Sequence, residues 1–277
     1  MSAHPARVQA ISRGQWFGMT FLLLSMNGAA RLAATTIIQE GGLVAAVNLF
    51  GVSAIIWMAV AAGASLSFND PDKTPLGRTD VVAVAAAITL MIIPVAPLSS
   101  VALTALGAWV VIRTRRDRPL RRGALIFIAI TGSLLWGRAL LAAGSDLFLS
   151  WDGRIAGLVA GTGGTANVVQ FANNAGTYYV APGCSSLQGI SLAIVLWVTV
   201  VQYYNLTIGR RALITLGAAI TGAIVANVLR LAAIASWPAH FDSLHAGLGA
   251  TVFGWLGLFL IIAAVGIGLR HALFRPV

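Results

Sequence analysis

The chain contains a single cysteine, and its neighbours place it where a thiol could be reactive. Cys184 follows Pro182 and Gly183 and precedes a long apolar stretch, so we expect it at the cap or in the first turn of a helix. A helix N-terminus offers unpaired N–H groups and a positive potential, which lower the pKa of a thiol and can stabilise an oxyanion. A cysteine in an apolar protein is also often an inert buried residue. Cys184 alone leaves both interpretations open.

Two further polar residues interrupt the apolar segments that follow Cys184. Arg230 lies near the end of the predicted helix 213–236, where an arginine either faces a polar partner or extends its charged end to the membrane surface. Asn227 shares its helix face. His245 opens the next predicted helix and could donate or accept a proton. Asp242 could orient that imidazole or cap the helix.

Together these residues contain the parts of a cysteine-nucleophile acyl-transfer site. Cys184 supplies a thiolate, Arg230 a cation that stabilises charge, and His245 a general acid or base. His240 competes with His245 for the last role. A single cysteine excludes an internal disulfide, and no cysteine and histidine pair has metal-ligand spacing. We therefore expect no metal and no cofactor.

The composition is that of an integral membrane protein. Of 277 residues, 58% are hydrophobic and 9% are charged, and the mean hydropathy is +0.87. In an ordinary soluble domain about a quarter of the residues are charged. A transmembrane helix needs roughly 20 apolar residues, so the chain has room for about eight spans and not for a separate soluble domain. We expect an all-α polytopic membrane protein in which residues 1–277 form one integral membrane domain.

Apolar segments and the turn signals between them define eight predicted spans. They cover residues 16–38, 43–66, 80–93, 98–112, 123–143, 184–206, 213–236 and 246–268. The first four form an N-terminal part, 16–112, and the last four belong to a catalytic part, 113–277. Between the third and fourth spans, Pro94 and Pro97 are compatible with a tight hairpin or with a kink in one long helix.

The distribution of basic residues decides for the hairpin and sets the predicted orientation. With eight spans and the N-terminus inside, most of the 18 lysines and arginines fall in the tails and internal loops, and only Arg154 lies in an external loop. Merging the two spans would put most of the lysines and arginines that follow them outside the membrane, against the positive-inside rule. We expect a cytoplasmic-membrane protein with both termini, including Arg7 and Arg275, in the cytoplasm. The net charge of +10 then reflects topology, and no nucleic-acid partner is expected.

The basic cluster at residues 113–122 acts as a topology determinant on this interpretation, and it could also bind anionic membrane lipid.

The predicted outer loop, residues 144–183, is long enough to have structure of its own. Its first part, LFLSWDGRIAGLVAG, is amphipathic and could lie along the membrane interface with Trp151 as an anchor. Its second part contains TANVVQF and TYYVAPG, two segments rich in β-branched and aromatic residues, separated by ANNAG. This pattern predicts a β-hairpin that leads directly to Cys184.

Three motifs in succession resemble a known family. VAPGCSSL (180–187), ANVLRLAAI (226–234) and HAGLGATVFGW (245–255) are similar to the Cys, Arg and His motifs of the exosortase/archaeosortase family, in the same order and on successive helices. The resemblance covers roughly residues 80–268. The family commonly has Cys-Ser-Gly where this chain has Cys184, Ser185 and Ser186, which retains every reactive group.

The resemblance implies a sorting transpeptidase for exported surface proteins. Such enzymes recognise a C-terminal signal composed of a Pro-Glu-Pro-like motif, a transmembrane helix and a basic tail. They cut on the outer face, and an envelope acceptor, lipid or polysaccharide, can receive the new C-terminus. In this chain the implied mechanism has Cys184 form a thioester, Arg230 hold the thiolate or oxyanion, and His245 protonate the leaving amine.

Five residues are expected to bind substrate or support the site: Arg138, Ser185, Ser186, Asn227 and Asp242. Arg138 could line the same cavity or form a structural pair with Asp146.

Two other classes of protein remain as alternatives. A transporter or channel would also have intramembrane arginines and glycine-rich helices, although such proteins tend to have internal repeats and polar sites at the midplane. A membrane glycolipid or acyl transferase could use His245 with acidic residues. In both alternatives Cys184 would be dispensable.

Overall fold

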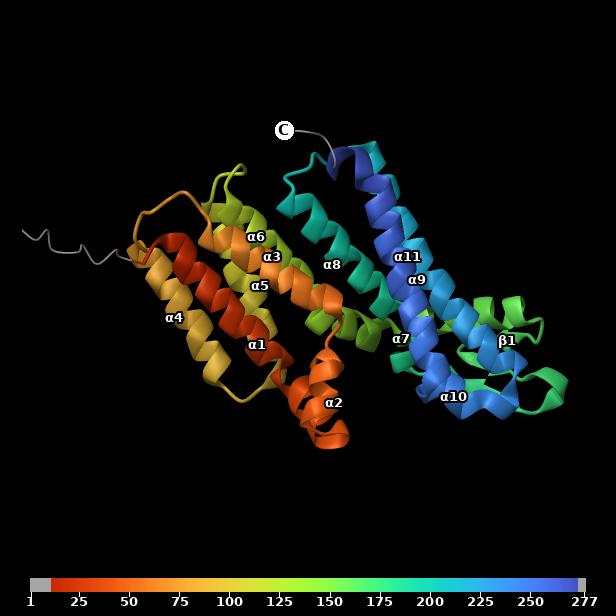
Figure 1. The fold of residues 1–277 in the computed structure, drawn as a ribbon. Helices are drawn as coiled ribbons and strands as arrows, with labels where there is room; N and C mark the ends of the chain where they lie inside the picture. Colours follow the sequence, from red (N-terminus) through yellow and green to blue (C-terminus); the bar gives the residue numbers. More distant parts are fainter. Residues whose placement is uncertain (1–10, 274–277) are drawn as a thin grey trace, which may run out of the picture. The chain divides into compact units, whose positions relative to one another are not determined.

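The computed structural model describes residues 11–273, which form helices and one small sheet (Figure 1). The chain divides into two compact units, one ending at Thr131 and the other beginning at Gly132. The predicted cytoplasmic tails with Arg7 and Arg275 lie outside the described residues. The prediction of a mainly helical protein is confirmed.

The first unit consists of helices. They are α1 (Arg13–Glu40), α2 (Gly42–Val47), α3 (Ala54–Phe68), α4 (Arg78–Ile92), α5 (Ala96–Arg113) and α6 (Pro119–Thr131), with a 3-10 turn at Leu49–Gly51. Its core contains fully buried aromatic rings from α1 and α6, and Phe21 stacks on Phe127 with 4.8 Å between ring centroids. Gly63 of α3 lies against the Phe127 ring, so α3 and α6 approach closely.

The prediction of one continuous span at 43–66 is wrong. The chain breaks after the short α2, because Leu49, Phe50 and Gly51 have φ values of 52°, 57° and 72°, which a right-handed helix cannot contain. Ser53 then caps α3 by accepting a hydrogen bond from the N–H of Ile55. Only Ala54–Phe68 remains as a helix of this segment with substantial length.

The hairpin predicted around Pro94 and Pro97 is present. Helix α4 ends at Ile92, α5 begins at Ala96 with a proline in its first turn, and the two helices pack against each other.

Buried carboxylates tie the ends of these helices together. Asp80 accepts hydrogen bonds from Arg13 Nε at 2.7 Å and from Trp109 Nε1 at 3.0 Å. Asp70 accepts from Arg118 Nη2 at 2.5 Å and from the N–H of Leu120 at 2.9 Å. Arg118, a member of the predicted basic cluster, is therefore engaged within the protein.

The second unit carries the predicted chemistry. Its helices are α7 (Gly137–Ala160), α8 (Leu187–Tyr203), α9 (Arg210–Ser236), α10 (Phe241–Ala246) and α11 (Leu248–Leu273), and its strands are β1 (Gly164–Thr165), β2 (Val168–Gln170) and β3 (Thr177–Tyr179). A π-helical turn at Gly132–Trp136 precedes α7, and 3-10 turns lie at Ala172–Asn174, Pro182–Cys184 and Pro238–His240.

Helix α7 extends past residue 143 to Ala160, but its backbone is non-helical at Gly144 (φ −134°), where two helical segments meet at a kink. The predicted end of a helix at residue 143 coincides with this kink, and the expected amphipathic segment is the helical part that follows it. The non-helical part of the predicted outer loop begins after Ala160. Gly161 ends α7 in the left-handed conformation (φ 69°), which glycine adopts without strain.

The predicted hairpin is confirmed and gains a strand. β1, β2 and β3 form an antiparallel sheet in sequence order, with Val169 opposite Tyr178. The turn between β2 and β3 uses left-handed Asn173 and Asn174, and Gly176 has a φ of 105°. β1 is too short for any strand pattern to predict.

Small residues bring the long helices of this unit together. A Cβ at Gly189 of α8 would lie 3.1 Å from the Ala223 side chain of α9, and one at Gly222 of α9 would lie 3.1 Å from the Leu260 side chain of α11. Such close backbone approach is typical of helix packing in membranes.

Within residues 11–273, three helices are long and apolar enough to cross a membrane, namely Arg13–Glu40, Arg210–Ser236 and Leu248–His271, and the interrupted pair α6 and α7 would add a fourth. Shorter apolar helices lie at Ala54–Phe68, Pro97–Arg113 and Leu187–Tyr203. The eight predicted spans are not confirmed by this count.

Candidate functional site

Cys184 lies in the turn between β3 and α8 and not in the helix itself. It is the last residue of the 3-10 turn Pro182–Cys184, and α8 begins at Leu187 with Ser186 as its cap. The predicted cap or first-turn position is therefore wrong by two residues. The cause is local, because Pro182 begins a tighter turn and Ser185 returns to extended backbone (φ −73°, ψ 144°) before α8 starts.

Most N–H groups around the thiol have acceptors. The N–H of Cys184 donates to Ala181 O at 2.8 Å, that of Ser185 to Pro182 O at 3.3 Å, and that of Leu187 to Ser185 Oγ at 3.3 Å. The N–H of Ser186 donates to Asp152 at 2.9 Å. The N–H of Gly183 takes part in no hydrogen bond of the described residues, so it is the one unpaired backbone donor of this turn.

Asp152 organises this turn, and the sequence analysis missed it. It lies on α7, is buried, and accepts three hydrogen bonds, from Ser185 Oγ at 3.0 Å, Ser186 N at 2.9 Å and Ser186 Oγ at 2.7 Å. Ser185 and Ser186, the two serines expected to support the site, both donate hydrogen bonds to this carboxylate. An acidic residue within the apolar end of a helix was the available signal.

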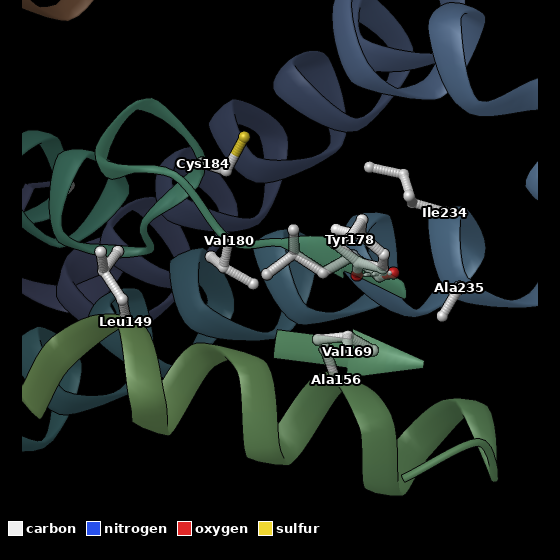
Figure 2. Packing of buried hydrophobic residues seen from close by; sticks show 9 residues of the cluster. Leu149, Ala156, Val169, Tyr178, Val180, Cys184, Ile234 and Ala235 are labelled. Carbon is white, nitrogen blue, oxygen red and sulfur yellow. Dashed lines mark hydrogen bonds between the residues drawn. The ribbon is translucent and has the colours of Figure 1, made fainter. Parts of the chain in front are cut away.

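The Cys184 side chain joins a hydrophobic cluster. It is 6% exposed, and the cluster contains Leu149 and Ala156 of α7, Val169, Tyr178 and Val180 of the hairpin, and Leu231, Ile234 and Ala235 of α9. Figure 2 shows the hairpin residues between the α7 side chains and those of α9, with the sulfur at the edge of the group. The hairpin therefore positions Cys184 by packing between two helices.

Asn227 contacts the cysteine directly through the backbone. Its Nδ2 donates to Cys184 O at 2.9 Å. The Cys184 turn is therefore held by α9, which follows it in the chain, as well as by Asp152 of α7, which precedes it. Its predicted supporting position is thus adjacent to Cys184.

Arg230, one turn further along α9, is tied to α10. Its Nε donates to Leu244 O at 3.1 Å and its Nη2 donates to His245 O at 2.5 Å. These carbonyls belong to the last turn of α10, where a helix has unpaired acceptors and a negative potential. Guanidinium has five N–H donors, and the hydrogen bonds of the described residues use only these two.

His245 does not open the long helix α11 as predicted. It lies in the last turn of α10, and α11 begins at Leu248. Its exposed imidazole stacks on Phe241, with 5.1 Å between ring centroids and 10° between ring planes. Gly247, with extended backbone, separates the two helices.

Asp242 does not orient the His245 ring, and His240, the competing histidine, lies in the 3-10 turn before α10. Both side chains are exposed, and no hydrogen bond in the described chain joins Asp242 to the His245 ring.

Tyr178 packs in the same hydrophobic cluster as Cys184 and against the rings of Phe171 and Phe241. Its hydroxyl donates to Leu231 O at 2.7 Å, and its ring lies 5.2 Å from Phe171 and 6.3 Å from Phe241. Burial raises the pKa of the Tyr178 phenol well above its usual range, a negative charge at Cys184 raises it further, and the Arg230 cation lowers it. Tyr178 thus lies within electrostatic range of both groups.

The second unit therefore brings Cys184, Asn227, Arg230 and His245 to one region around Tyr178 and the α9–α10 junction. Within the described residues no hydrogen bond joins the Cys184 sulfur to Arg230 or His245. Arg138 lies in the first turn of α7, and its side chain, with any pairing to Asp146, is outside the described part.

These features define a membrane-embedded helical protein whose one thiol lies in a hydrogen-bonded turn of the same compact unit that contains Arg230 and His245. Residues 154–267 match the family model of the transmembrane exosortases (Exosortase_EpsH), and the matched region contains Cys184, Arg230 and His245. This part of the chain is similar to the transmembrane exosortases, the family that the three motifs resemble. The match is shorter than the 80–268 expected. No curated protein and no solved structure matches the chain.

Proposed function

We propose that the protein is a membrane-embedded cysteine transpeptidase or protease that cleaves the C-terminal sorting signal of exported proteins. The observation that carries the proposal is the Cys184 turn, which Asp152 of α7 and Asn227 of α9 hold by hydrogen bonds. Arg230 lies one helical turn after Asn227 on α9. The family match supports the class of reaction.

In the proposed mechanism the Cys184 thiolate attacks a peptide carbonyl and forms the C–S bond of a tetrahedral intermediate. The N–H donors of Arg230 that the described hydrogen bonds leave unused stabilise the oxyanion. The intermediate collapses as the C–N bond breaks, and His245 protonates the leaving amine. Water or an envelope acceptor then attacks the thioester and releases Cys184.

The proposed topology keeps the eight spans inferred from charge, with both termini in the cytoplasm and Cys184 facing outward. In this arrangement the shorter apolar helices also cross the membrane, residues 16–112 form an N-terminal part, and residues 113–277 form a catalytic part. A substrate with a basic tail inside and its cleavage motif outside would be oriented in the same way.

The test is processing of a tagged reporter that ends in a Pro-Glu-Pro segment, an apolar helix and a basic tail. Cys184→Ala should abolish cleavage, because no other thiol is present. Cys184→Ser retains size and polarity with a poorer nucleophile, and we expect at least a hundredfold loss. A covalent reporter adduct should form with the native chain and not with Cys184→Ala.

Ala193→Ser, a conservative change at a buried position of α8, provides the matched control and should cleave normally. Retained processing by Cys184→Ala would overturn the proposal and favour the transporter or the glycolipid or acyl transferase.

A further inference from the structure

The outer edge of strand β3 has backbone groups without partners. The N–H of Phe171 donates to Gly176 O and the N–H of Val180 donates to Asn167 O, so Gly176 and Val180 direct their polar groups toward β2. In an antiparallel pair such positions alternate. Thr177 and Tyr179 lie between them, and their N–H and C=O groups therefore point away from β2.

No other element in the described chain closes this edge. β2 is the single strand paired with β3, and no hydrogen bond of the described residues uses the backbone of Thr177 or Tyr179. Both residues are exposed, and the Tyr179 side chain is 71% exposed. An exposed edge with unpaired N–H and C=O groups is a template for an added strand.

The same strand leads into the site. Residues 180–183 join β3 to Cys184, and Ala181, Pro182 and Gly183 are all exposed. At about 3.3 Å per residue, the backbone of Tyr179 is at most roughly 16 Å from that of Cys184, and an added strand would lie about 4.8 Å from β3. The inner face of β3 is already fixed, because Tyr178 is bonded to Leu231 and packed on Phe241.

We propose that the open edge of β3 binds the substrate as an added β-strand. The occupant is the extended peptide segment that precedes the substrate's transmembrane helix, and it pairs with the backbone of Thr177 and Tyr179. Backbone pairing places the chain beside Cys184 with its carbonyl groups in a regular register, whatever its side chains. This inference rests on the proposed function and adds the binding mode of its substrate.

The first test is disulfide crosslinking without catalysis. In a Cys184→Ala chain, which has no other cysteine, Thr177→Cys or Tyr179→Cys is introduced separately. Single cysteines are scanned through the eight positions before the apolar helix of the same tagged reporter. Added-strand pairing predicts crosslinks at alternate reporter positions. It also predicts that the strongest position moves by two residues between the two variants, since side chains on a strand alternate.

The second test removes one outward N–H. Tyr179→Pro eliminates a donor that β2 does not use, and proline is tolerated on the open side of an edge strand. Tyr179→Val also removes the ring but keeps the N–H, so the difference between the two variants isolates the backbone contribution. We expect the proline variant to have a KM roughly tenfold above that of the valine variant, with a similar kcat and melting temperature.

The outcomes separate this inference from the proposed function. Cleavage by the native chain with crosslinks at consecutive reporter positions, or with none, would overturn the added strand and leave the cysteine chemistry standing. Equal KM values for Tyr179→Pro and Tyr179→Val would count against it in the same way. Alternating crosslinks to a reporter that the native chain does not cleave would support the binding edge and overturn the transpeptidase.

Discussion

Asp152 holds Ser186 at two points, with Ser186 Oγ 2.7 Å from Oδ1 and Ser186 N 2.9 Å from Oδ2. Ser186 is the cap of α8, so a carboxylate from another helix occupies the positive end of α8. Cys184, two residues earlier, is thereby positioned by Asp152. In the proposed mechanism Arg230 is the cation that stabilises negative charge at the site.

Asp152→Asn should loosen the Cys184 turn. The amide has one acceptor oxygen in place of two and forms uncharged hydrogen bonds, so the unfolding free energy should fall by about 1–3 kcal/mol. The displaced turn should expose the Cys184 thiol, which is 6% exposed in the native chain, so iodoacetamide should alkylate it faster while reporter cleavage decreases. The rate of alkylation at one fixed pH provides the readout.

Asp146→Asn is the matched control, since Asp146 is an exposed acid on the same helix. It should change neither stability nor alkylation. If Asp152→Asn leaves the rate of alkylation unchanged, Asp152 does not position the Cys184 turn.

Arg230→Lys tests the geometry of the guanidinium. Lysine retains the charge but cannot donate in a fork to both Leu244 O and His245 O. We expect cleavage to fall by roughly a factor of 100 to 1,000, as for loss of an oxyanion donor, and the amides of α10 to exchange faster with solvent.

Arg154→Lys, at an exposed position of α7, should leave both measurements unchanged. Normal cleavage by Arg230→Lys would show that charge alone is sufficient at this position.

Gly157→Ala should loosen the hairpin from α7. A Cβ at Gly157 would lie 2.5 Å from Gly163 O and 2.6 Å from Gly163 C, both backbone atoms that cannot rotate away. Overpacking of this kind costs about 1–3 kcal/mol, and the displaced hairpin should reduce cleavage. Thermal unfolding measures the first effect.

Gly217→Ala on α9 is the opposite case, because nothing lies within 4 Å of its added Cβ. Helix propensity should stabilise that variant by about 0.5–1 kcal/mol. Equal melting temperatures for the two variants would contradict the close approach at Gly157.

Tyr178→Phe should alter the response to alkaline pH. Burial raises the pKa of Tyr178, so the native state keeps this phenol protonated while the unfolded chain ionises it. The associated stability is fully present below the ordinary tyrosine pKa and declines as pH rises above it. The native chain should therefore lose more unfolding free energy between pH 8 and pH 11 than Tyr178→Phe does.

At pH 8 the same variant should be less stable by about 1 kcal/mol, because the hydrogen bond to Leu231 O is lost. Tyr179→Phe, on the exposed face of β3, should match the native chain at both pH values. A parallel pH response of all three chains would show that Tyr178 is not buried as described.

Local patterns in the sequence were sufficient for much of this molecule. Apolar segments predict most of the helices, the Asn173, Asn174 and Gly176 turn predicts the hairpin, and three motifs predict the family. These signals depend on neighbours within a few residues, which is why they can be recognised without a fold. The break at Leu49 and Phe50 was missed because neither residue type favours left-handed backbone.

Contacts between distant segments decided the site. Asp152 is 34 residues from Ser186, and the partners of Arg230 exist only because α10 ends beside α9. The continuation of α7 to Ala160 is favoured by the packing of Gly153 and Gly157 against the hairpin backbone. The sequence by itself determined which groups could react and which segments are helical or extended. Only tertiary packing decided which N–H donors near Cys184 and on Arg230 remain unused. Their acceptors lie on residues remote in the chain, such as Asp152 and Leu244, or in a turn whose geometry depends on packing.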